Sequence, residues 1–99
     1  MFQRSNAVPS HVPAPDRDRE LALYKYDMCG FCQRVLRTID RLGLEVEMRD
    51  TLMERQHRAD LFEATGRTTV PCLFIDGQPL HESSDITAWL EAYAARSAA

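Results

Sequence analysis

A chain of 99 residues with a formal net charge of −3 suits one small domain and has no general attraction to nucleic acid or to an anionic membrane. Its three cysteines are too few, and odd in number, for a disulfide scaffold, so we expect a reducing compartment and predict a cytoplasmic location. No apolar run approaches the ~20 residues of a membrane span. We therefore expect neither a membrane nor nucleic acid as a partner.

The first part of the chain, residues 1–20, shows neither a helical nor a strand period and lacks the apolar core of a secretory signal. It holds three prolines and then a charged run over residues 16–20. Such a composition offers little apolar surface to bury. We predict a disordered N-terminal tail over residues 1–20, followed by one domain over residues 21–95.

Apolar periodicity predicts an α/β domain after this tail. The expected order is strand, helix, strand, helix, strand, strand, helix, over residues 21–26, 31–42, 44–49, 51–65, 70–75, 78–81 and a last helix from residues 83–85 onward. The first strand, helix and strand form a right-handed crossover, which makes the two strands parallel. Asp76-Gly77 is a strong hairpin signal between the last two strands. The order βαβαββα predicts a four-stranded mixed sheet flanked by helices, as in thioredoxin-like domains.

The helices carry further predictions about their ends and faces. Thr51, followed three residues later by Glu54, is a capping-box pattern that predicts the start of the second helix, and Gly43 and Gly66 follow the first two helices. In chain order, the apolar faces that we expect the helices to bury are Phe31, Val35, Leu36, Ile39 and Leu42; Leu52, Ala59, Leu61 and Phe62; and Ile86, Trp89, Leu90 and Tyr93.

Cys29 and Cys32 form a C-x-x-C pair at the predicted start of the first helix. This spacing puts both sulfurs within one helical turn, at the end where backbone N–H groups lack partners and the dipole favours negative charge. A thiolate is the nucleophile of thiol chemistry, so the pair indicates a dithiol redox centre. The alternative is half of a zinc site, but the histidines provide no second pair of ligands at finger spacing, and we predict no metal site.

Residues 21 to about 93 resemble the glutaredoxin family in three separated motifs. The first is the strand and C-x-x-C helix, the second is residues 66–71 with the strand and turn over residues 74–77, and the third is residues 83–86. This trio, in this order and spacing, is more specific than a lone C-x-x-C. Glu82-Ser83-Ser84 also resembles the amino-terminal domain of glutathione transferases, which shares the fold and the glutathione site.

The resemblance implies a glutathione-dependent thiol–disulfide oxidoreductase that reduces disulfides or glutathione mixed disulfides. Cys29 would be the attacking cysteine and Cys32 the resolving one. Glutathione would be the cosubstrate, disulfide or glutathionylated proteins the substrates, and the protein a monomer.

The resemblance also implies a glutathione site. Thr69, Val70 and Pro71 would line it, with Pro71 in the cis form and the Val70 backbone presented to the cysteinyl part of glutathione. Ser84 and Asp85, at the start of the last helix, would hold the γ-glutamyl carboxylate and amine. Backbone N–H groups at a helix start favour a carboxylate, and an aspartate favours an ammonium group.

The chain departs from the family pattern at three places. Gly30-Phe31 replaces the usual Pro-Tyr between the cysteines, and His81-Glu82 replaces the usual Gly-Gly before the last helix. The lysine that commonly stands three residues before the first cysteine is here a tyrosine, and its neighbour Lys25 is expected to face the other way. The glycine carboxylate of glutathione would then bind Arg67 or Gln33, or bind more weakly.

Several alternatives remain open from the sequence. The chain would be a carrier of a glutathione-ligated [2Fe–2S] cluster if Cys29 from each of two chains held the iron. Only residues 94–99 follow the last apolar stripe, too few for a transferase's helical domain, so a transferase-like glutathione-binding module without catalysis is a third hypothesis. Cys72 is a buried core residue or a third redox thiol. Three arginines of the first helix form a solvated face or steer acidic substrates: Arg34, Arg37 and Arg41.

Overall fold

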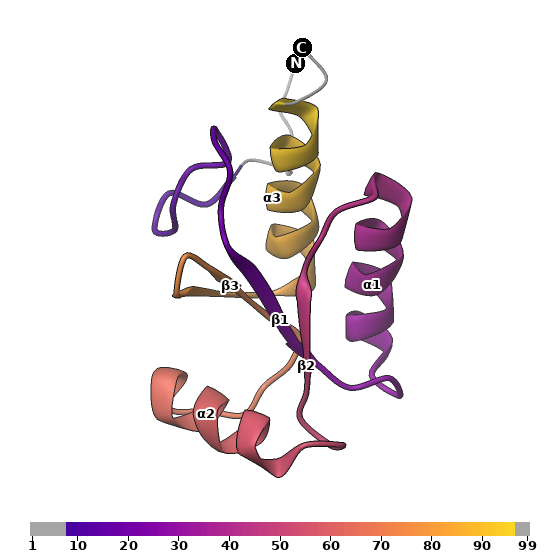
Figure 1. The fold of residues 1–99 in the computed structure, drawn as a ribbon, viewed down its shortest axis with the longest axis vertical. Coiled ribbons are helices and arrows are strands. Elements are labelled where there is room, and N and C mark those ends of the chain that lie inside the picture. The colour runs from indigo at the N-terminus through magenta and orange to yellow at the C-terminus, as the bar shows by residue number, and fades with distance from the viewer. Residues whose placement is uncertain (1–7, 97–99) are drawn as a thin grey trace.

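The computed structural model describes residues 8–96, which form strands and helices in the order predicted from the sequence (Figure 1). The elements are β1 (Leu21–Lys25), α1 (Gly30–Leu42), β2 (Glu47–Asp50), α2 (Arg55–Thr65), β3 (Cys72–Ile75), β4 (Gln78–His81) and α3 (Ser83–Arg96). Within these described residues, no helix is long and apolar enough to cross a membrane.

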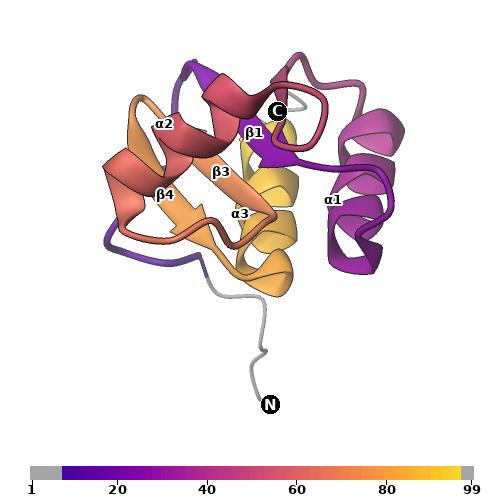
Figure 2. The same cartoon turned by 90° about the horizontal axis from the view of Figure 1, so that it is seen from below.

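The four strands form one mixed sheet in the order β2-β1-β3-β4. β1 runs parallel to β2 and antiparallel to β3, and β4 pairs antiparallel with β3. Figure 2 shows α2 on one face of the sheet and α1 and α3 on the other. The predicted four-stranded sheet flanked by helices is therefore confirmed. Because β1 and β2 are parallel, the loop that follows β1 and the turn that follows β2 emerge at the same edge of the sheet.

Side chains of the central strands alternate between two apolar layers. The larger layer lies between the sheet and helices α1 and α3, and Trp89 is fully buried in it. Its other members include Leu21, Leu23, Val35, Ile39, Leu73, Ile75, Leu80, Ile86, Leu90 and Tyr93. The smaller layer, under α2, contains Ala22, Tyr24, Leu61, Cys72 and Phe74. The apolar face predicted for the last helix is buried in full.

Helix α2 differs from the prediction in its start and in its buried face. It begins at Arg55, and Glu54 makes no side-chain capping bond, so the capping box at Thr51 is wrong. The carboxylate of Asp50 instead accepts hydrogen bonds from the N–H groups of Leu52 and Met53 at 2.9 and 2.8 Å, which holds residues 51–53 in a turn. Within the expected apolar face only Leu61 is buried, because the late start leaves Leu52 outside the helix and Phe62 lies on its outer side, 57% exposed.

The segment over residues 8–20 lies against α3 and does not form a solvated tail. Val12 is 8% exposed within the larger apolar layer. The indole N–H of Trp89 donates to the Pro13 carbonyl at 2.9 Å, and the Arg19 N–H donates to the Tyr93 hydroxyl at 3.0 Å. The buried polar groups of Trp89 and Tyr93 need hydrogen-bond partners, and the segment provides them. The prediction of a disordered tail is therefore wrong for residues 8–20. Residues 1–7 of the predicted tail lie outside the described residues.

Candidate active site

Cys29 occupies the N-cap position of α1. Its backbone is extended (φ −83°, ψ 120°), and its sulfur accepts the N–H of Cys32 at 3.3 Å. At most helix starts a serine, threonine or aspartate oxygen takes this place. Here a sulfur takes it, so the Cys29 sulfur lies against the free N–H groups at the positive end of the α1 dipole.

The other two cysteines are fully buried, whereas Cys29 is partly exposed; all three are free thiols. Burial, followed by the hydrogen bond with Cys29, raises the pKa of Cys32 to about 12. Burial raises the pKa of Cys72 to about 12 as well. Cys32 and Cys72 therefore stay protonated at neutral pH, and Cys29 is the one of the three that a substrate can approach.

The loop before β3 brings a distant segment to Cys29. The Val70–Pro71 peptide bond is cis, as expected from the resemblance. The Val70 carbonyl oxygen lies 3.9 Å from the Cys29 sulfur and accepts a hydrogen bond from the thiol. Two segments about forty residues apart in sequence therefore meet at the reactive sulfur.

A groove of about 200 Å³ opens beside this contact. Its lining residues are Phe31, Arg67, Thr69, Val70, Pro71, His81, Glu82 and Ser83. The three residues predicted from the loop before β3 are among them. From the start of α3, however, the lining comes from Glu82 and Ser83. Ser84 is exposed, Asp85 is half-buried, and neither lines the groove, so their roles stay predictions.

Glu82 explains this arrangement at the start of α3. It adopts a left-handed backbone conformation (φ 74°), which is uncommon for a residue with a side chain. The turn brings Ser83, 8% exposed, into the lining of the groove. The resemblance placed a glycine of the usual Gly-Gly at this position, and glycine adopts such a conformation at no steric cost.

Sequence reasoning did not assign Phe31 and His81 to the groove. Phe31 was expected in the buried face of α1 but is 67% exposed in the first turn, beside the cysteines. The Nε2 atom of His81 is buried and has no hydrogen-bond partner among the described residues. Burial and the nearby Arg67 guanidinium lower the pKa of His81, against the opposing effect of Glu82. The replacement of Gly-Gly by His81-Glu82 was the one signal for His81 in the sequence.

Lys25 and Gln33 are held by the loop that precedes Cys29. The ammonium of Lys25 pairs with Asp27 at 2.8 Å and Asp50 at 3.4 Å, and the Gln33 amide donates to the Asp27 carbonyl at 2.7 Å. Of the two residues expected for the glycine carboxylate, Arg67 lines the groove and Gln33 is engaged elsewhere. No group of three or more His, Cys, Asp or Glu side chains within residues 8–96 is arranged to hold a metal ion.

The mixed sheet, the C-x-x-C pair at the start of α1 and the cis-proline loop define a thioredoxin-like protein. A family model described as Glutaredoxin matches residues 21–80, so the chain belongs to the glutaredoxin family. A search of curated proteins finds no significant sequence match.

Solved structures share the fold. A wheat glutaredoxin is 25% identical (TM-score 0.61, 76% of this chain and 78% of that one), and a buckwheat glutaredoxin–glutathione complex is also 25% identical (TM-score 0.57, 77% and 81%). A glutathione transferase homologue from Drosophila mojavensis with bound glutathione is 20% identical (TM-score 0.66, 78% of this chain). The chain spans 36% of the length of that transferase homologue.

Proposed function

We propose that this protein is a glutathione-dependent thiol–disulfide oxidoreductase. The observation that carries the proposal is the environment of Cys29, whose partly exposed sulfur accepts a helix N–H at 3.3 Å and lies 3.9 Å from the Val70 carbonyl. Membership of the glutaredoxin family and the glutathione complex of the buckwheat protein support glutathione as the cosubstrate.

The proposed reaction begins with a glutathione mixed disulfide. The Cys29 thiolate attacks the glutathione sulfur, a Cys29–glutathione disulfide forms, and the substrate thiolate leaves and takes up a proton. The thiolate of a second glutathione then attacks the bound glutathione sulfur, which releases oxidised glutathione and regenerates Cys29. With a protein disulfide, Cys32 instead closes a disulfide with Cys29, and two glutathione molecules supply the two electrons that reopen it.

The groove is the proposed glutathione site. The backbone of Thr69 and Val70 would pair with the cysteinyl part of the tripeptide, next to Cys29. The free N–H groups at the start of α3 suit the γ-glutamyl carboxylate, and Asp85 suits its amine. Arg67 provides a cation for the glycine carboxylate.

The test is a deglutathionylation assay with glutathione and glutathione reductase, run beside an assay with thioredoxin reductase as the electron donor. We expect turnover with glutathione only. Cys29→Ser should reduce it to the uncatalysed background because the nucleophile is gone. Cys32→Ser should retain deglutathionylation and lose the reduction of protein disulfides. Full activity of Cys29→Ser together with loss in Cys32→Ser would contradict the assignment.

The two alternatives predict different results. A cluster carrier would be brown and absorb visible light after anaerobic reconstitution with iron, sulfide and glutathione. A non-catalytic module would bind glutathione, and every variant would be equally inactive in the assay. The cytoplasmic location and the monomeric state stay predictions.

A further inference from the structure

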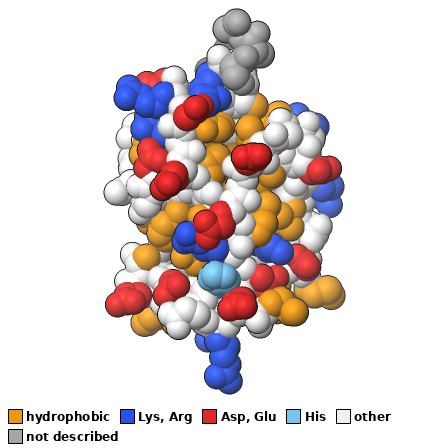
Figure 3. Space-filling view, in the orientation of Figure 1, with side chains coloured by type: hydrophobic (Ala, Val, Ile, Leu, Met, Phe, Trp, Pro, Cys, Tyr) orange, Lys and Arg blue, Asp and Glu red, His pale blue; other side chains and the backbone are white. Residues whose placement is uncertain are grey.

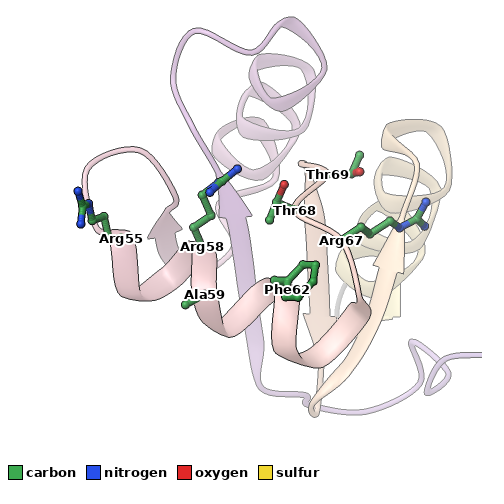
Figure 4. A pocket seen from close by; sticks show the side chains of 7 residues that line it. All are labelled: Arg55, Arg58, Ala59, Phe62, Arg67, Thr68 and Thr69. Atoms are coloured by element: carbon green, nitrogen blue, oxygen red, sulfur yellow. The ribbon is translucent and has the colours of Figure 1, made fainter.

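A second hollow, of about 830 Å³, lies along the outer side of α2 and continues onto the loop that precedes β3 (Figure 4). Arg55, Arg58, Ala59 and Phe62 line it from the helix, and Arg67, Thr68 and Thr69 line it from the loop. We call this hollow the α2 groove. It shares Arg67 and Thr69 with the groove beside Cys29, so the two form one continuous surface.

The α2 groove is cationic although the whole chain has a net charge of −3. No aspartate or glutamate lines it, and its three arginine side chains make no ion pair with any described residue. The arginines elsewhere that do pair with a carboxylate are Arg17, Arg19, Arg41, Arg49 and Arg96. The groove therefore presents positive charge without a carboxylate partner on a surface that continues into the groove beside Cys29, which favours an acidic ligand.

The α2 groove also has an apolar part, formed by Ala59 and Phe62. The Phe62 ring is 57% exposed and lies between Arg58 and Arg67 in Figure 4. Other large hydrophobic side chains are exposed at the same end of the sheet, in the loops after β1 and β2 and the first turn of α1: Met28, Phe31, Leu52 and Met53. Figure 3 shows hydrophobic side chains at this lower end of the molecule. Exposed aromatic and methionine side chains beside arginines are typical of protein-binding surfaces.

We propose that the α2 groove binds an acidic segment of a protein substrate, in which a cysteine near Asp or Glu residues carries the disulfide or glutathione mixed disulfide that reacts at Cys29. The proposal rests on the proposed function. The groove volume lies within the ~300–1,000 Å³ of ligand sites, enough for several side chains. An apolar residue of the segment would pack on Phe62, while its carboxylates meet Arg55 and Arg58.

The experiment compares glutathionylated peptides that differ only in the residues flanking the cysteine, which are Glu, Gln or Lys. We expect kcat/KM to be about tenfold higher for the Glu peptide than for the Lys peptide at low ionic strength, and the preference to fade at high salt. A double variant, Arg55→Gln with Arg58→Gln, should abolish the preference. The matched control is Arg34→Gln with Arg37→Gln, which removes two exposed arginines of α1.

The ratio of the Glu to the Lys peptide is the readout, because weaker glutathione binding in a variant would lower all three peptides alike. Phe62→Ala should lower kcat/KM for a peptide with an apolar residue next to the glutamates, without changing the charge ratio. Equal kcat/KM for the three peptides in the unmodified protein would overturn the proposal. So would loss of the preference in the α1 control, or single-stranded oligonucleotide binding at the groove that the Glu peptide cannot displace. If even the Gln peptide is not deglutathionylated, the proposed function fails instead.

Discussion

Three cysteines in one small domain differ because of where their sulfurs lie. Cys29 replaces a helix-capping oxygen and is partly exposed, whereas the structure buries Cys32 behind it and Cys72 in the layer under α2. Burial penalises a thiolate, and it raises the pKa of both buried thiols to about 12. The expectation that Cys72 is a core residue is thereby supported by its position.

The raised pKa of Cys72 predicts a loss of stability at alkaline pH. The Cys72 thiol has a pKa of about 12 in the folded protein, against 9.0 for an ordinary thiol. The contribution of this group to the free energy of unfolding is therefore complete below pH 9 and is lost as the pH rises toward 12. We expect the free energy of unfolding to fall by roughly 1 kcal/mol per pH unit from this group over that range. Urea unfolding of the unmodified protein and of Cys72→Ala at a series of pH values measures the difference.

The slope of the Cys72→Ala variant is the decisive quantity, because other groups titrate in both proteins. The variant should be less stable at neutral pH but should decline more slowly above pH 9. Parallel declines in the two proteins would show that Cys72 ionises as easily in the folded chain as in the unfolded one.

At the scale of elements, the start of α3 places a strained turn in the lining of the groove beside Cys29. Glu82 holds φ at 74° and lines the groove, and Ser83 follows it into the helix. Such a backbone costs a residue with a side chain on the order of 1 kcal/mol relative to glycine. Strain retained beside a groove suggests that the side chain of Glu82 has a role there.

Replacing Glu82 by glycine tests whether the strained backbone is retained for a role of the Glu82 side chain in the groove. Glu82→Gly should raise the free energy of unfolding by about 1 kcal/mol, because glycine accepts the left-handed conformation, and should weaken glutathione binding. Urea unfolding and calorimetric titration with glutathione measure the two effects. Glu45→Gly, at an exposed position without a positive φ, is the control and should not stabilise the chain. A stabilised Glu82→Gly with unchanged affinity would mean that Glu82 plays no part in binding.

At the scale of the whole molecule, the segment over residues 8–20 is part of the fold. Its Val12 side chain joins the larger apolar layer, and its backbone satisfies the polar atoms of Trp89 and Tyr93. The carboxylate of Asp76, in the β3–β4 turn, accepts the Glu20 N–H at 2.8 Å and the Arg19 guanidinium at 3.1 Å. The segment is thus anchored at both α3 and the hairpin.

Deletion of residues 1–18 should therefore destabilise the chain. One buried valine contributes about 1.5 kcal/mol and the indole hydrogen bond about 1 kcal/mol, so we expect a loss of roughly 2–3 kcal/mol. Thermal unfolding of the deleted and full chains measures it, and the alkylation rate of Cys29, at the opposite end of β1, should not change. Equal stability of the two chains would restore the prediction of a free tail.

The sequence by itself determined the order of elements and the position of the C-x-x-C pair at the start of α1. Apolar periods, a C-x-x-C pair, a Val-Pro step and a Ser-Ser-Asp motif are local patterns that can be recognised directly in the sequence. The apolar periods and the C-x-x-C spacing predicted the βαβαββα order and the cysteine pair at the start of α1, because each depends on residues close together in the chain. The cis form of Pro71 and the residues expected for glutathione were implied by the resemblance to the glutaredoxin family.

Only the tertiary structure decided what depends on distant partners. The backbone carbonyls of Lys25 and Asp50 accept the N–H groups of Thr51 and Glu54 that a capping box would have paired, and α3 supplied the surface that holds residues 8–20. The left-handed turn at Glu82 put Ser83 into the groove beside Cys29, and the position of α2 placed three arginines along a second groove that shares Arg67 and Thr69 with the first. Which acceptor binds a given N–H group, and which segment covers a given apolar surface, depends on segments far apart in the chain. A local sequence pattern therefore cannot predict it.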